Sequence, residues 1–150
     1  MAYQNILIAV DLTDEAEEVF AAARNAAQEQ SSVNVSACTI VRPLARTYGG
    51  LDMANVVAGA PFEEEMRTQA KDKLKTLGEE YGVSAADVYV RMGAPAAEIR
   101  ALADELKADL IVIGTHGRHG LGVLLGSTAN AVLHGVSCDV LVVKIHSSED

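Results

Sequence analysis

The sequence is poor in basic residues and in cysteine, and it has no long hydrophobic run. Twelve Lys and Arg stand against 21 Asp and Glu, which gives a formal net charge of −9 over 150 residues. A chain so charged repels polyanions unless its cations gather on one face, so we expect no nucleic-acid partner. No apolar run approaches the roughly 18 residues of a membrane span, and the N-terminus lacks the basic region of a signal peptide. We therefore expect a soluble, cytoplasmic protein without a membrane partner.

Several kinds of reactive site are also missing. Cys38 and Cys138 form no CxxC pair, so buried reduced thiols are expected. His116 and His119 have neither cysteine near them in sequence, which argues against a metal site. There is no GxSxG motif and no pair of carboxylates in a glycine-rich segment, so no catalytic residue is assigned.

What the chain does contain is a regular alternation of apolar runs and amphipathic patterns. Strands are expected over residues 3–10, 33–41, 87–92, 108–113 and 139–145, and helices from about residue 13, over 61–82, 96–106 and 127–135. Residues 44–59 show no stable period and are expected to form a loop. Such alternation with short connections predicts one α/β domain, a parallel sheet with helices on both faces.

Three local features of these elements make testable expectations. Asp14 followed by Glu17 is typical of a helix start. Pro61 is expected to open the second helix, and its buried stripe is expected to consist of Phe62, Met66, Ala70, Leu74 and Leu77. The last strand comes with no helix after it and is expected at a sheet edge, where it invites pairing with a second chain and hence a homodimer.

The most informative segment is a glycine-dense loop after the fourth strand. Five glycines occur in the thirteen positions from Gly114 to Gly126, and Ser127 and Thr128 follow, where they can cap the next helix. Ligands of parallel sheets bind beyond the carboxyl ends of the strands, where helix N-termini favour anions. The loop lacks the lysine of a Walker A motif, and its spacing differs from GxGxxG. A phosphate pocket and a purely structural turn both remain open.

Two side chains near this loop have alternative interpretations. Asp11 ends the first strand, where it could contact a ribose or a metal or could cap the helix that begins near Thr13; the residues alone favour the cap. Arg118 is the fixed cation of the loop and could pair with a phosphate or simply face water.

Three segments together resemble the universal stress protein family over essentially the whole chain. They are residues 6–11 (ILIAVD), 93–99 (GAPAAEI) and 109–143, which includes the glycine loop. The resemblance implies a single domain over residues 1–150 and a five-stranded parallel sheet of order 3-2-1-4-5, the adenine nucleotide alpha hydrolase-like arrangement. It also implies a homodimer whose last strands pair across a two-fold axis.

The family has an ATP-binding branch and a nucleotide-free branch, and the loop shares features with both. Gly114, Gly117, Gly126 and Ser127 match the ATP-binding pattern in kind, but eight residues instead of nine separate Gly117 from Gly126. The shorter spacing is that of the nucleotide-free branch, whose bulkier replacements of the later glycines are absent here.

If the pocket binds nucleotide, the resemblance assigns parts of the ligand to particular residues. The phosphates are assigned to the backbone of Gly117 and of Gly126, Ser127 and Thr128. The ribose falls to Asp11 and the loop near Gly114, and the adenine to the backbone near Val41.

The sequence thus predicts a stress-response protein that binds ATP, with or without Mg²⁺, or another adenine nucleotide, with slow hydrolysis at most. The first alternative is a nucleotide-free homodimer that acts through protein contacts. The second is a small enzyme of the wider α/β nucleotide-binding class, for which a lysine or an acidic metal cluster would have to converge on the loop.

Overall fold

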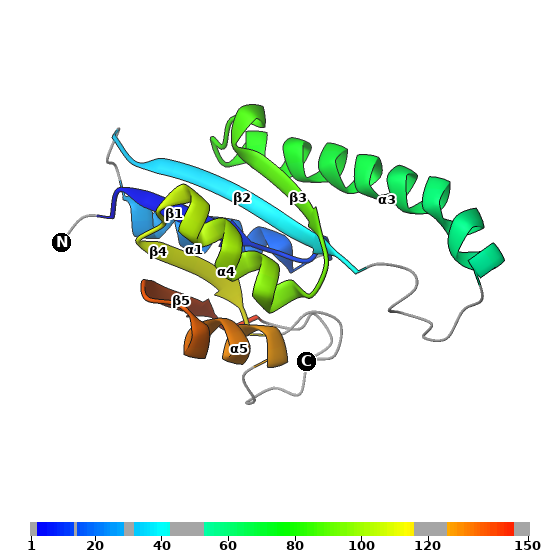
Figure 1. The fold of residues 1–150 in the computed structure, drawn as a ribbon. Helices are drawn as coiled ribbons and strands as arrows, with labels where there is room; N and C mark the ends of the chain where they lie inside the picture. The colour runs from blue at the N-terminus through cyan, green and yellow to red at the C-terminus, as the bar shows by residue number, and fades with distance from the viewer. Residues whose placement is uncertain (1–2, 14, 29–31, 43–52, 116–125, 146–150) are drawn as a thin grey trace.

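The computed structural model describes residues 3–13, 15–28, 32–42, 53–115 and 126–145, and of residues 53–61 it describes the backbone alone. Five parallel strands form one sheet of order β3-β2-β1-β4-β5, as expected. The strands are β1 (Asn5–Ala9), β2 (Asn34–Val41), β3 (Val88–Met92), β4 (Leu110–Gly114) and β5 (Asp139–Val143). The predicted fold class and the edge position of the last strand are confirmed (Figure 1).

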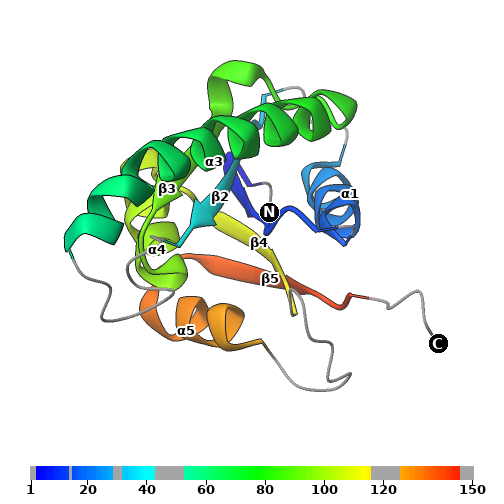
Figure 2. The same ribbon diagram turned by 90° about the vertical axis from the view of Figure 1, so that its right-hand side faces the viewer.

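Helices cover both faces of the sheet. They are α1 (Ala16–Ala27), α3 (Met53–Glu80), α4 (Pro95–Leu106) and α5 (Ser127–Gly135), and a 3-10 turn, η1 (Ala85–Asp87), precedes β3. The pair α1 and α3 lies on one face and the pair α4 and α5 on the other (Figure 2).

The central strands β1 and β4 are buried on both sides, which explains why they read as continuous apolar runs. Ile6 and Ile8 of β1 pack toward α1 and α3, whereas Leu7 and Ala9 pack toward α4 and α5. Phe20 of α1 and Leu102 of α4 are fully buried on the two faces. The amphipathic patterns that predicted helices in these two regions thus agree with the buried faces of α1 and α4.

The start of α3 differs from the prediction. The helix begins at Met53, so Pro61 lies inside it and does not open it, and residues 53–59 are helical and not part of a loop. Of the predicted stripe, Leu74 is buried and Leu77 partly buried, but Phe62 and Met66 are 53% and 38% exposed. The N-terminal half of α3 extends past the carboxyl ends of the strands (Figure 1). Because that half packs on no sheet, its sequence carries no reliable buried period.

The start of α1 also differs. Asp14 lies outside the described residues, and the helix begins at Ala16 with Glu15 as its N-cap residue. Thr13 forms the turn before it, because its carbonyl accepts a hydrogen bond from the Ala16 N–H at 3.1 Å.

Candidate functional site

The carboxyl ends of β1 and β4 are the place where a ligand site is expected in this sheet. These strands are neighbours, but the chain leaves β1 into α1 on one face and leaves β4 toward α5 on the other. Ligands of open α/β sheets bind at such a point, where the helices leave the sheet in opposite directions. Asp11 follows β1 and Gly114 ends β4, so the sheet topology brings these two predicted site residues to one place.

Asp11 is exposed, and its carboxylate does not act as the helix cap that the sequence favoured. Its Oδ1 accepts a hydrogen bond from the Thr13 hydroxyl at 3.1 Å, and its carbonyl accepts one from the Thr13 N–H at 2.6 Å. Because α1 begins only at Ala16, the carboxylate lies too early in the chain to serve the first turn. The Asp11 side chain is therefore exposed just beyond the carboxyl end of β1.

Gly114 has a packing role that sequence reasoning did not foresee. A Cβ added there would lie 3.2 Å from Ile145 and 3.4 Å from Val19, so a side chain would push against the core. The neighbouring Thr115 joins the carboxyl ends of β4 and β5: its N–H donates to the Val143 carbonyl at 2.9 Å, and its hydroxyl accepts from the Ile145 N–H at 3.2 Å. The sequence signal that could have revealed this contact is a threonine directly after a buried strand.

Val41 lies at the end of β2, opposite Met92 of β3. Its carbonyl accepts a hydrogen bond from the Gly93 N–H at 3.1 Å, so this acceptor is already used within the protein. Gly93 has a φ of +147° at the turn into α4, a conformation that favours glycine. Any base contact at this strand end would have to use other backbone atoms or the half-buried Val41 side chain.

The N-terminus of α5 is the clearest anion-binding feature of the described residues. Gly126 is the N-cap residue, with φ −63° and ψ 152°, and Ser127 and Thr128 are the first two helical residues, so neither is the cap. Glycine has no side chain to accept from the first turn, and the N–H groups of Ser127 and Thr128 have no carbonyl partner within the helix. The Asn130 N–H donates to the Gly126 carbonyl at 2.9 Å. Gly117 and Arg118 lie outside the described residues.

The two cysteines are unpaired, as expected. Complete burial raises the pKa of the Cys38 thiol to about 12, and partial burial also raises the pKa of Cys138. Both thiols are therefore unreactive at neutral pH. Cys138 is less buried than the sequence suggested.

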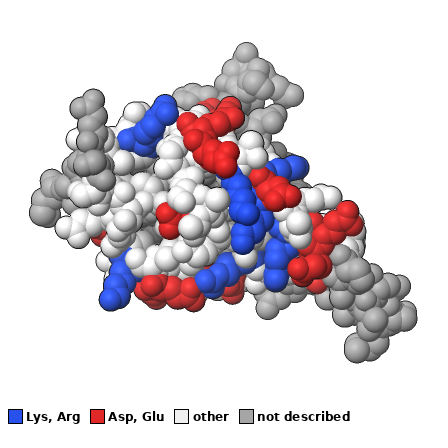
Figure 3. Space-filling model, turned by 90° about the horizontal axis from the view of Figure 1, so that it is seen from above, with Lys and Arg blue, Asp and Glu red and all other residues white. Residues whose placement is uncertain are grey.

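On the face seen from above, basic and acidic side chains are interleaved and form no continuous basic surface (Figure 3). Within the described residues, no group of three or more His, Cys, Asp or Glu could hold a metal ion. Nor does any described helix have the length and hydropathy needed to cross a bilayer.

A sequence profile described as the universal stress protein family matches residues 2–144. The chain belongs to this family. It is 37% identical over 144 residues to universal stress protein A homolog 1 of Coxiella burnetii, with 95% of this chain and 97% of the relative covered. It is 41% identical over 93 residues to homolog 2 of the same organism, covering 62% of this chain and 64% of that relative.

Solved structures extend the likeness to the whole fold. UspA from Lactobacillus plantarum has a TM-score of 0.77 at 26% identity, covering 95% of this chain and 99% of that one. A universal stress protein solved in complex with cAMP has a TM-score of 0.59 at 27% identity, covering 96% and 98%. The structural neighbours of this universal stress protein thus include one that holds an adenine nucleotide.

Proposed function

We propose that this universal stress protein binds an adenine nucleotide, ATP or a cyclic nucleotide, at the carboxyl ends of β1 and β4. The observation that carries the proposal is the N-terminus of α5, where a glycine cap leaves the backbone donors of the first turn without a side-chain partner. Such donors, together with the helix dipole, can hold phosphate without a lysine. The cAMP complex of a structural neighbour supports the same ligand class.

The parts of the ligand follow from the arrangement of the strand ends. The phosphates fall to the N–H groups of Ser127 and Thr128, and the ribose hydroxyls to the exposed carboxylate of Asp11. The adenine falls beside Val41 at the end of β2, next to β1 in the sheet. Gly117 and Arg118 complete the phosphate site in this proposal, and Gly114 contributes by packing and not by contact. The chain acts in the cytoplasm as a binding protein, with slow hydrolysis at most.

The decisive experiment replaces the cap itself. Gly126→Asp introduces a carboxylate that can cap α5, because the extended φ and ψ at this position suit any residue. The same carboxylate occupies the donors and repels phosphate. We expect the affinity for ATP and cAMP, measured by calorimetry, to fall by about tenfold or more, because the new carboxylate repels the phosphates and competes for their backbone donors.

The control is Gly126→Asn, which caps without charge and is expected to weaken binding less. Thermal unfolding should show both variants as stable as the natural chain, to within a few tenths of a kcal/mol. A natural chain that gives no binding heat and releases no nucleotide on denaturation would contradict the proposal. The result would favour a nucleotide-free protein that acts through protein contacts.

We also propose that the protein is a homodimer that pairs through β5. This strand is the outermost of the sheet beside β4, and Leu141 on it is 38% exposed. A parallel sheet with an exposed, apolar edge strand is a ready template for a second chain. Leu141→Glu should convert the dimer to a monomer in sedimentation velocity, because like charges then meet near the two-fold axis. Leu133→Glu on α5 is the matched control, and a dimer that survives Leu141→Glu would count against the β5 interface.

A further inference from the structure

A cavity of about 610 Å³, open to solvent, lies between α1 and α3. No α5 residue lines it, but Thr13 does, and the Thr13 hydroxyl donates to Asp11 of the proposed nucleotide site. The apolar part of the cavity comes from Ala16 on α1 and Leu77 on α3. Its rim carries four charged side chains, Glu17 on α1 and Asp72, Lys73 and Glu80 on α3. Three carboxylates and one ammonium leave a formal charge of −2 around an apolar floor.

The same face of α3 continues beyond the cavity as an exposed apolar surface. Lys73, Thr76 and Glu80 line the cavity, and Met66 and Phe62 precede Lys73 by seven and eleven residues. This spacing repeats on one side of a helix, so Phe62 and Met66 face the same way as the cavity lining. They are 53% and 38% exposed, which is unusual for such large apolar side chains when they lie together. We call the cavity and this extension the α1–α3 groove.

We propose that the α1–α3 groove docks a basic, amphipathic helix of a partner protein. The stretch from Phe62 to Glu80 is about 27 Å long at 1.5 Å per residue, which matches a helix of about 18 residues. The groove walls are helices and offer no strand edge, so an extended segment would leave its backbone N–H and C=O groups unpaired. A helix satisfies these groups internally and can lay its apolar face on Leu77, Met66 and Phe62.

The charges select the sign of the partner. None of Glu17, Asp72, Lys73 and Glu80 makes an ion pair within the described part of the chain, so the excess of carboxylates is not neutralised internally. Lysine and arginine on the polar flanks of a docked helix would complement it. A second copy of this chain is a poor occupant of the groove, because none of its described helices has more Lys and Arg than Asp and Glu.

The test uses the intact protein and a synthetic 18-residue helix of Leu and Lys with one apolar face, labelled for fluorescence anisotropy. A second peptide of the same composition has its leucines spread around the helix. We expect the amphipathic peptide to bind at least about tenfold more tightly, because only it can bury an apolar face. Equal affinities would overturn the proposal, as would displacement of the peptide by spermine at equal charge concentration, which would indicate a site for small cations.

Variants separate docking from general electrostatic attraction. Met66→Glu makes the protein more acidic, so non-specific attraction predicts tighter binding of the basic peptide, whereas docking predicts about tenfold weaker binding. Leu133→Glu on α5 makes the same charge change on an exposed leucine on the other side of the sheet and should not weaken binding. If Met66→Glu tightens binding as Leu133→Glu does, the groove is not the site.

The α1 wall is tested by charge reversal. Glu17→Lys is expected to weaken binding several-fold, while Asp104→Lys, at an exposed position of α4, should change it by less than about twofold. Equal effects of the two reversals would overturn the proposal. Circular dichroism and thermal unfolding establish that each variant is folded.

Discussion

Polar groups at the two ends of the sheet differ in what they bind. At the amino end, Asp109 precedes β4 and its carboxylate accepts from the N–H groups of Gln4 and Asn5, at 2.8 and 2.9 Å. At the carboxyl end, Asp11 follows β1 and its exposed carboxylate accepts from the hydroxyl of Thr13, two residues away. The same residue type joins distant segments at one end and remains exposed at the other.

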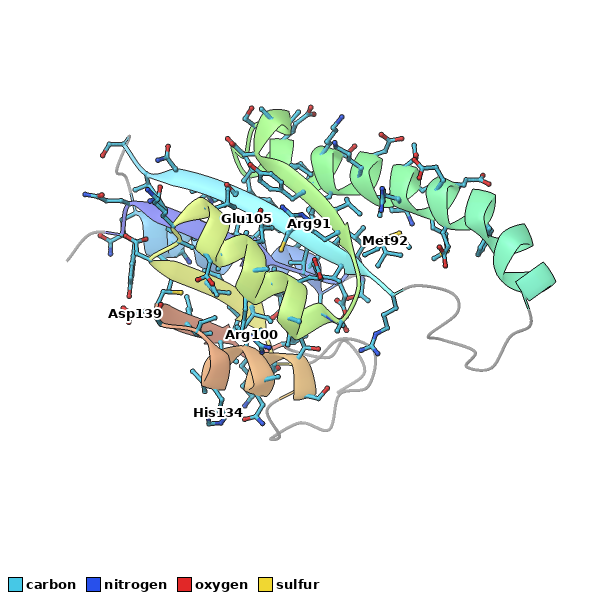
Figure 4. All side chains as sticks on the ribbon, in the orientation of Figure 1. Arg91, Met92, Arg100, Glu105, His134 and Asp139 are labelled. Carbon is cyan, nitrogen blue, oxygen red and sulfur yellow. The ribbon has the colours of Figure 1, made fainter. Side chains whose placement is uncertain are left out.

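The amino end is further held by side chains from separate elements. The Asn5 side chain donates to the Lys107 carbonyl and accepts from the Asn34 side chain, and the Tyr3 hydroxyl donates to Asp139 at 2.8 Å. Figure 4 shows Asp139 at this end of the molecule, at the start of β5. These contacts span more than 100 residues of sequence in several cases and serve stability.

Helix α5 shows the same contrast within one element. Near its C-terminus, the Arg100 side chain of α4 donates to the Ala131 carbonyl at 3.1 Å and passes over Gly135. At its N-terminus the N-cap residue is a glycine, which has no side chain to cap the helix. At one end the polar groups are bonded to one another, and at the other end they are available to a ligand. A ligand site at the carboxyl end requires this difference.

The largest effect is expected from exchanging the two aspartates for alanine. Asp109→Ala leaves two backbone N–H groups without their charged acceptor and should lower the free energy of unfolding by about 2 kcal/mol. Asp11→Ala should change it by less than about 0.5 kcal/mol, because an exposed contact two residues away holds nothing distant in place. Urea unfolding at pH 7 measures both.

Calorimetry on the same two variants completes the comparison. Asp11→Ala should weaken adenine nucleotide binding, while Asp109→Ala, at the opposite end, should leave it unchanged in the folded protein. If Asp11→Ala destabilised the chain as much as Asp109→Ala, the two ends would not differ as described.

A smaller effect is expected where α5 is fixed to α4. A Cβ at Gly135 would lie 2.5 Å from Cδ of Arg100, so Gly135→Ala must displace the guanidinium from the Ala131 carbonyl. We expect a loss of about 1 kcal/mol, at the low end of overpacking costs. In an Arg100→Ala background the sign should reverse, because alanine is then simply the better helix former. Thermal unfolding of the four proteins measures the coupling, and additive effects would show that the two residues do not meet.

The sequence was informative wherever a pattern is set by burial. The five strands and the amphipathic helices α1 and α4 follow from apolar runs and periods, because these elements pack on the sheet. The strand order was implied by the resemblance to the universal stress protein family, and the sheet has that order. The first half of α3 packs on no sheet, so neither Met53 nor the exposure of Phe62 could be read from a period.

The candidate site was only partly predictable for a related reason. Asp11 and Gly114 were placed correctly at strand ends, since parallel topology brings all carboxyl ends to one edge. Gly114 makes room for Ile145 and Val19, which lie about 30 and 95 residues away in the sequence. No local sequence pattern encodes such distant contacts. The glycine cap of α5 was likewise hidden, because the sequence offered Ser127 one position later.

The smallest effect is expected for the solvent-exposed ion pair of Arg91 and Glu105. This pair belongs neither to the contacts at the amino end of the sheet nor to the candidate site at its carboxyl end. Arg91 of β3 donates to both carboxylate oxygens of Glu105 on α4, and this hydrogen bonding holds the pKa of Glu105 below its ordinary value of 4.5 (Figure 4). A lowered pKa in the folded state stabilises the protein above the ordinary value, and the contribution disappears as the pH falls through the folded pKa. The difference in urea midpoint between the natural chain and Glu105→Gln should therefore be constant near neutral pH, shrink below pH 4.5 and shrink with added salt. A difference that grew as the pH fell would show that Arg91 does not stabilise the carboxylate of Glu105.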